Sequence, residues 1–301
     1  MNFNQLAAVL ADEEKAIALV EQQRWPDGVV CPHCGVLGRA YRLQGKTTRK
    51  GLWKCGACRS QFTVRVNTIF EDSHIPLGKW LLAIHRMCSS KKGVSANQLS
   101  RELELTYKSS WFLCQRIRYA MKRKPLSGLL KGVVEADETY VGGRPPNNKH
   151  RGYIKRRKAI AVSLIQRDGE ARSFRVDAAS KPRLHALIRD NVEGGAVIMT
   201  DMHPSYKGIE PGYDHHTVDH RVEYVRGIVH TNFAESFFSL FKRGIVGSFH
   251  HISEKHMQRY LDEFDFRWNS RKELDGERTL KCVKQSEGKR LTYRQPIESS
   301  R

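Results

Sequence analysis

The clearest hydrophobic period lies in the last third of the chain. Across residues 230–269, large apolar side chains recur at steps of three and four, beginning with Phe233, Phe237, Leu240 and Phe241. This spacing predicts an amphipathic helix that starts near Thr231 and Asn232. Its polar stripe carries Asn232, Glu235, Ser239 and Lys242. Glu235 and Lys242 are two turns apart and therefore face the same space, although a solvated helix face has the same pattern.

Strand patterns precede this helix. Valines bracket three acids in residues 132–143, GVVEADETYVGG. Further strands are expected at 158–165, 171–176, 195–201 and 216–218, with a helix near 183–191. The two central strands pair as a hairpin across Arg167-Asp168-Gly169. This order predicts an α/β domain with a mixed sheet flanked by helices.

The first half of the chain has helical periods. One amphipathic helix is expected over residues 3–23, and three more over 76–90, 95–103 and from Thr106 onward. Ser95 with Gln98 forms a capping box at the second of these three. Lys108 and Arg116 lie on the side of the last helix that is expected to face outward. This arrangement predicts a helix-turn-helix that binds DNA through its last helix, with a plain helical bundle as the alternative.

Two CxxC pairs stand between these helices. Cys31 and Cys34 are followed, after 20 intervening residues, by Cys55 and Cys58. This spacing predicts a zinc ribbon in which four sulfurs complete the metal shell, so that His33 is a bystander. A pair of redox dithiols is the alternative, but no strand–helix setting of the thioredoxin type surrounds the cysteines.

Charge adds a partner to this picture. The formal net charge is +20, and the surplus is concentrated in residues 1–131. Such a surplus attracts a polyanion, which makes double-stranded DNA the expected partner. The basic residues of the ribbon are consistent with a DNA contact and equally with a solvated surface. No apolar run reaches the length of a membrane span, and we expect a cytoplasmic protein that makes no membrane contact.

These patterns divide the chain into three expected domains. Residues 1–72 hold the first helix and the ribbon, and residues 73–127 hold the helix-turn-helix. A linker at 124–128 leads to residues 128–301, which hold the α/β domain.

Three acids of the last domain are expected to form one metal site. Asp137 lies in the first strand, Asp201 ends a later strand, and Glu235 lies on the helix face. Acids in this order of elements are expected to converge on two divalent ions, because Mg²⁺ prefers oxygen ligands. Such an ion pair stabilises both oxygens of an in-line phosphoryl transfer.

The sequence resembles the bacterial insertion-sequence transposases that join a zinc ribbon to a ribonuclease-H-like Asp-Asp-Glu domain. The resemblance rests on CPHCG, CGACR, VEADETYVGG, TDMHPSY, HTNFAESFFSLFKRGIVGSFHH and RYLDEFDFRWN. It implies that Asp137, Asp201 and Glu235 are the catalytic residues. It also implies that Lys242, together with Arg243, holds the DNA end.

The sequence leaves an alternative residue for two of the three acids. Strand alternation turns Glu135 to the same face as Asp137, and Asp137 is preferred because DETYVGG is the motif of the resemblance. Asn232 lies one turn before Glu235, and Glu235 is preferred because a carboxylate holds Mg²⁺ better than an amide does.

The expected function follows from this resemblance. We expect a transposase that binds the terminal inverted repeats of its element through the ribbon and the helix-turn-helix. With Mg²⁺ or Mn²⁺ it would cut a DNA strand and join the 3′ end to target DNA, as a homodimer or a higher oligomer. The alternatives are a DNA-binding regulator derived from a transposase and a metal-dependent nuclease that does not join ends.

Overall fold

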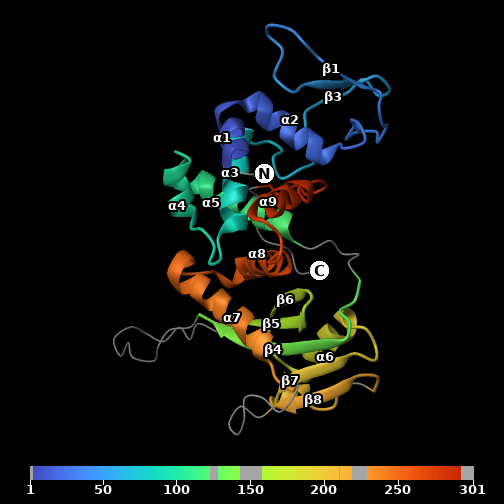
Figure 1. The fold of residues 1–301 in the computed structure, drawn as a ribbon, viewed down its shortest axis with the longest axis vertical. Coiled ribbons are helices and arrows are strands. Elements are labelled where there is room, and N and C mark those ends of the chain that lie inside the picture. Colours follow the sequence, from blue (N-terminus) through green and yellow to red (C-terminus); the bar gives the residue numbers. More distant parts are fainter. Residues whose placement is uncertain (1–2, 123–127, 143–157, 210, 219–228, 293–301) are drawn as a thin grey trace. The chain divides into compact units, whose positions relative to one another are not determined.

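The computed structural model describes residues 3–122, 128–142, 158–209, 211–218 and 229–292 (Figure 1). Most of the linker expected at 124–128 lies outside these residues. The chain divides into two compact units: residues 1–122 with 272–301, and residues 123–271. None of the described helices is long and apolar enough to cross a membrane.

The division differs from the expected domains at the C-terminal helix α9 (Asp275–Lys284). This helix packs in the first unit against α3 (Leu77–Ser89) and not with the α/β domain. Arg278 Nη1 donates to the carbonyl of Cys88 at 2.9 Å, and Thr279 Oγ1 lies 3.0 Å from His85 Nδ1. These contacts hold α9 in the first unit.

The first unit begins with two helices in place of the single helix expected over residues 3–23. Asp12 separates α1 (Phe3–Ala11) from α2 (Glu13–Arg24), because its Oδ1 accepts the amide of Glu14 at 2.9 Å and caps the second helix. The ribbon follows as three short antiparallel strands in the order β1 (Ala40–Arg42), β2 (Trp53–Cys55) and β3 (Gln61–Phe62).

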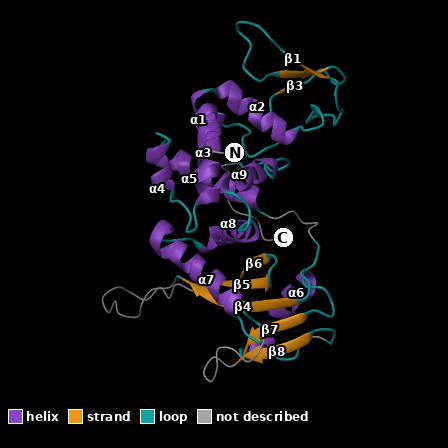
Figure 2. Cartoon of the chain, viewed as in Figure 1, coloured by secondary structure: helices purple, strands orange, loops and turns teal. Residues whose placement is uncertain are grey.

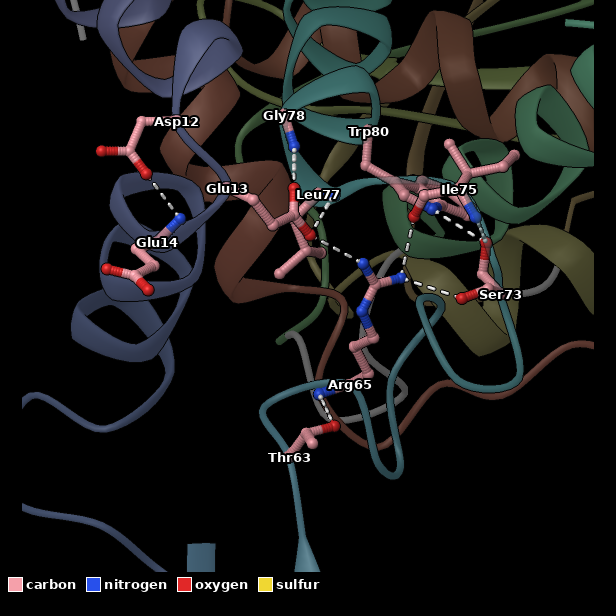
Figure 3. Close-up of polar contacts among 10 residues, drawn as sticks. All are labelled: Asp12, Glu13, Glu14, Thr63, Arg65, Ser73, Ile75, Leu77, Gly78 and Trp80. Carbon is pink, nitrogen blue, oxygen red and sulfur yellow. Dashed lines mark hydrogen bonds and ion pairs between the residues drawn. The ribbon is translucent and has the colours of Figure 1, made fainter. Parts of the chain in front are cut away.

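A network of polar contacts joins the ribbon to α3 (Figure 3). Glu13 Oε1 accepts from Leu77 N at 2.9 Å and from Arg65 Nη2 at 3.1 Å. Arg65 Nη1 donates to the carbonyls of Ser73 at 3.0 Å and Ile75 at 2.9 Å. The segment after the ribbon is therefore tied to the start of α3, which explains why the ribbon and the helices form one unit.

Two helices after α3 complete the expected helix-turn-helix arrangement. They are α4 (Ala96–Glu102) and α5 (Tyr107–Met121). Ser95 Oγ accepts the amide of Gln98 at 3.0 Å, and Thr106 Oγ1 accepts that of Ser109 at 3.2 Å. Both helices therefore begin where the sequence predicts.

The second unit is built on a mixed five-stranded sheet in the order β6-β5-β4-β7-β8 (Figure 2). The strands are β4 (Val133–Val141), β5 (Ala159–Gln166), β6 (Ala171–Val176), β7 (Val197–Asp201) and β8 (Asp214–Val218). β4, β5 and β6 are antiparallel neighbours, whereas β7 and β8 run parallel to β4. The strand order confirms the predicted mixed sheet of the α/β domain.

Helices cover both faces of this sheet. One core joins the sheet to α7 (Asn232–Gly244) and α8 (Met257–Asn269), and a second joins it to α6 (Lys181–Asn191) and the short 3-10 helix η1 (Pro204–Tyr206). β4 contributes to both, since Val141 packs in the first core and Val134 and Ala136 in the second. Alternation therefore turns the other odd-numbered residues of β4 toward α7.

Candidate functional site

Asp137 and Asp201 lie on adjacent strands. β4 and β7 are parallel, and their last registered pair joins Glu135 to Met199. Each aspartate is two residues beyond this pair on its own strand. Because residues two apart share a face of the sheet, the two carboxylates start from neighbouring positions on one side.

Glu235 approaches Asp137 from the first turn of α7. Both residues line an open pocket of about 390 Å³. The other lining residues are Glu138, Thr139, Phe238, Ser239, Lys242 and Arg243. The predicted polar stripe of the helix is therefore one wall of a concave site, with the carboxylate and both basic side chains on that wall.

Burial and the neighbouring acids raise the pKa of Asp137. Burial, the carboxylate of Glu138 and the carboxylates of Asp201 and Glu235 together raise the pKa of Asp137 to about 7. A hydrogen bond from the Glu138 amide to Asp137 Oδ1, 2.8 Å long, opposes this shift. Like charges crowd this site, so a bound cation would relieve the repulsion between them. The oxygen-only donor set therefore fits a hard divalent ion.

Glu138 points to the opposite face, toward η1. Its Oε2 accepts the hydroxyl proton of the buried Tyr206 at 2.8 Å, and its Oε1 lies 3.7 Å from His203 Nε2. Burial raises the pKa of Glu138, the Tyr206 hydrogen bond lowers it, and the charge of Asp201 raises it again. Glu138 thus belongs electrostatically to the acidic cluster, although its carboxylate is held by other partners.

Glu135, the alternative to Asp137, is fully buried and has its own set of donors. Arg167 Nε donates to Oε1 at 2.8 Å, and His230 Nδ1 lies 3.1 Å from the same oxygen. Oε2 accepts the backbone amides of Phe233 at 2.8 Å and Ala234 at 3.1 Å. The carboxylate is therefore bound to the start of α7 and does not line the pocket.

Asn232, the alternative to Glu235, is exposed at the first position of α7. Its backbone amide faces His230 Nδ1 at 3.4 Å. It is absent from the residues that line the acidic pocket. The geometry thus favours Glu235 as the third acid.

The three proposed metal-binding carboxylates do not converge on a single point. Among the described residues, the four cysteines of the ribbon are the only group of three or more His, Cys, Asp or Glu residues whose ligand atoms all lie within 4.8 Å of one another. The Cys31 and Cys58 sulfurs are 3.7 Å apart, as are those of Cys34 and Cys55. A tetrahedron with zinc–sulfur bonds of about 2.3 Å has edges of about 3.8 Å. The ribbon therefore has the geometry of a structural zinc site.

Arg116 was expected on the DNA-facing side of α5, and the structure corrects this. Its side chain is buried, donating from Nε to the Leu291 carbonyl and from Nη1 to the Ile69 carbonyl, each at 3.0 Å. Arg116 lies three residues after the buried Leu113 and four before the buried Ala120, so it falls within the apolar stripe. Lys108 is exposed in the first turn of the same helix, as expected.

Known families match both parts of the chain. Residues 11–61 match the transposase zinc-ribbon domain, and residues 129–269 match the ISXO2-like transposase domain. These two matches place the chain among transposase-type proteins, and the four cysteines of the ribbon agree with the first match. It carries an ISXO2-like transposase domain at residues 129–269, preceded by a transposase zinc ribbon at residues 11–61.

Individual proteins are also similar. An uncharacterised protein in transposable element ISH50 of Halobacterium salinarum is 28% identical over 277 residues, which cover 85% of this chain and 90% of the relative. The Mos1 transposase paired-end complex with left transposon end is 13% identical over 69% of this chain and 80% of that chain, with a TM-score of 0.28. A pre-cleavage Mos1 transpososome is 13% identical over 70% of this chain and 80% of that chain, with a TM-score of 0.23.

Sequence reasoning missed two residues near the site, Arg167 and His230. Arg167 was assigned only to a hairpin turn, and His230 only to the start of the helical pattern. Both surround the carboxylate of Glu135. Glu135 could have indicated the role of Arg167, because a buried carboxylate in a strand needs a positive partner.

Proposed function

We propose that the protein is a DNA transposase whose strand cleavage and strand transfer take place in the acidic pocket. The observation that supports this most is that Asp137 and Glu235 line one pocket with Lys242 and Arg243, while the nearby charge of Asp201 helps to raise the pKa of Asp137. The acids would bind divalent cations, and the basic side chains would contact DNA phosphates. The proposed reaction needs both metal ligands and phosphate contacts.

The acids and the basic residues have distinct parts in this proposal. Asp137, Asp201 and Glu235 would hold the divalent ions through their carboxylate oxygens. When bound, the Mg²⁺ or Mn²⁺ pair supplies positive charge to the attacking and leaving oxygens. Lys242 and Arg243 hold the DNA end through its phosphates.

The reaction has two displacements at phosphorus. In the first, water attacks a phosphodiester at the element end and the bond to the 3′ oxygen breaks, which leaves a 3′-hydroxyl and a 5′-phosphate. In the second, this 3′-hydroxyl attacks a phosphodiester of the target DNA and displaces its 3′ oxygen. The ribbon and the helix-turn-helix bind the terminal inverted repeats, and two protomers bring two ends together.

The test uses labelled DNA that carries the inverted ends flanking the coding region, incubated with the protein and Mg²⁺. The expected products are nicked ends and joined strands. Binding without nicks would indicate the regulator, and nicks without joined strands would indicate the nuclease.

Asp201→Asn supplies the control for the site. This variant keeps the size of the side chain but loses the charge, so it should bind the labelled DNA with unchanged affinity and cut it at least about 100-fold more slowly. Normal cutting by this variant would refute the assignment of the acids.

A further inference from the structure

The buried carboxylate of Glu135 connects the strand that carries Asp137 to the helix that carries Glu235. We propose that Glu135 is a positioning residue, which fixes the first turn of α7 and thereby the location of Glu235 relative to Asp137. The inference rests on the proposed function, because it concerns the spacing of two carboxylates of the same site.

The first step is the distance along β4. Glu135 and Asp137 face the same side of the sheet, because both are odd-numbered residues of one strand. Two residues of a strand span about 7 Å. An element attached to the Glu135 carboxylate is thus anchored two residues from Asp137 on the same face of the sheet.

The second step is the attachment of the helix. The first amides of an α-helix have no partner within the helix, and a side chain normally accepts them. Thr231, at the N-cap of α7, makes no side-chain cap hydrogen bond. Glu135 Oε2 accepts the amides of Phe233 and Ala234 instead, at 2.8 and 3.1 Å. A carboxylate at this end is also favoured by the helix dipole.

The third step is the restraint on the carboxylate itself. Arg167 Nε binds the other oxygen of Glu135 at 2.8 Å. Arg167 Nη2 donates to the carbonyl of His230 at 3.0 Å, which lies just before α7. Strand, hairpin turn and helix start are therefore joined around one carboxylate with no exposed surface.

The consequence concerns Glu235, which lies one residue after the second capped amide. Its side chain is exposed, so the backbone of this turn determines where its carboxylate can reach. The rest of α7 is held independently by Phe237 and Phe241 in the core. Loss of the Glu135 cap should therefore loosen the first turn while the helix remains folded.

The test compares Glu135→Gln with Glu263→Gln. Glu263 on α8 is matched in burial, with no exposed side-chain surface, and pairs with Arg267 at 2.8 Å. Hydrogen exchange of the first-turn amides of α7 is measured in full-length protein without added Mg²⁺ or Mn²⁺, and Mn²⁺ affinity is measured by electron paramagnetic resonance. Glu135→Gln should exchange at least about tenfold faster and bind Mn²⁺ about 10–100-fold more weakly, and Glu263→Gln should change neither.

A double variant separates the effect of Glu135 on the first turn of α7 from its effect on the thermal stability of the protein. Glu135→Gln removes the buried negative charge that faces Arg167, and Glu135→Gln with Arg167→Gln removes the positive charge as well. The double variant should recover thermal stability but keep the fast exchange and the weak Mn²⁺ binding.

Two results would overturn the proposal. One is first-turn exchange in Glu135→Gln that matches wild type, and the other is Mn²⁺ affinity that recovers together with stability in the double variant. If wild-type protein binds no Mn²⁺, the proposed function fails, and hydrogen exchange still decides whether Glu135 holds the helix.

Discussion

The pKa of Asp137 predicts that metal binding to the acidic pocket depends on pH. The neighbouring acids and burial raise this pKa to about 7. At that value the carboxylate is about nine-tenths ionised at pH 8 and about one-tenth ionised at pH 6. A metal ion binds the deprotonated form, so the protein should bind Mn²⁺ about tenfold more weakly at pH 6 than at pH 8.

The size of this change in Mn²⁺ affinity distinguishes the site from an ordinary carboxylate. An aspartate with a pKa near 3.9 remains ionised across the same range, and its affinity for Mn²⁺ would change by only about 1%. The assay is a titration of full-length protein with Mn²⁺ in chelator-free buffer, followed by the paramagnetic resonance signal of the free ion. Avoiding chelators keeps the ribbon zinc in place.

A variant at a neighbouring position tests the cause of the shift. Burial is the largest contribution and the charge of Glu138 is the next. Glu138→Gln removes that charge without removing a proposed metal ligand, so the pKa of Asp137 should fall and the pH dependence should weaken. A wild-type affinity that changes less than about twofold between pH 8 and pH 6 would refute the reasoning.

The remaining predictions concern the first unit. Cys55→Ser should remove the bound zinc, measured by elemental analysis, because it takes one of four sulfurs from the shell; Cys282→Ala, outside the ribbon, should keep one zinc per chain. Lys108→Ala should weaken DNA binding and lower the salt-dependence slope by about one, since one phosphate contact is lost. Arg116→Ala should instead lower the melting temperature by several degrees, since it leaves two buried carbonyls without donors, and equal melting temperatures would contradict this.

Local patterns in the sequence predicted much of the fold. The caps at Ser95 and Thr106 and the hairpin between β5 and β6 depend on residues that are close together in the chain. The prediction of Asp137 and Asp201 as site residues likewise depends on short stretches of sequence, the motif DETYVGG and the end of the strand before Met202. These features need only the period of the chain and the chemistry of a few neighbouring residues.

Features that depend on distant partners were not predicted. The break at Asp12 occurs inside an uninterrupted helical period, and only the capping geometry reveals it. The place of α9 depends on its contacts with α3, nearly 200 residues earlier in the chain. Arg116 was misplaced because a long side chain on an apolar stripe either reaches solvent or buries its stem, and the carbonyls that hold it lie in other segments.

The two acids of β4 show what the coordinates add to a motif. In the sequence, Glu135 and Asp137 are equivalent, because they are carboxylates two positions apart on one face of a buried strand. In the structure, Glu135 is surrounded by N–H donors and the cation of Arg167, whereas Asp137 is surrounded by other carboxylates. The protein itself compensates the charge of Glu135. The charge of Asp137 is repelled by its neighbours, and a bound cation would relieve that repulsion; this difference, independent of any motif, favours Asp137 over Glu135 as the metal ligand.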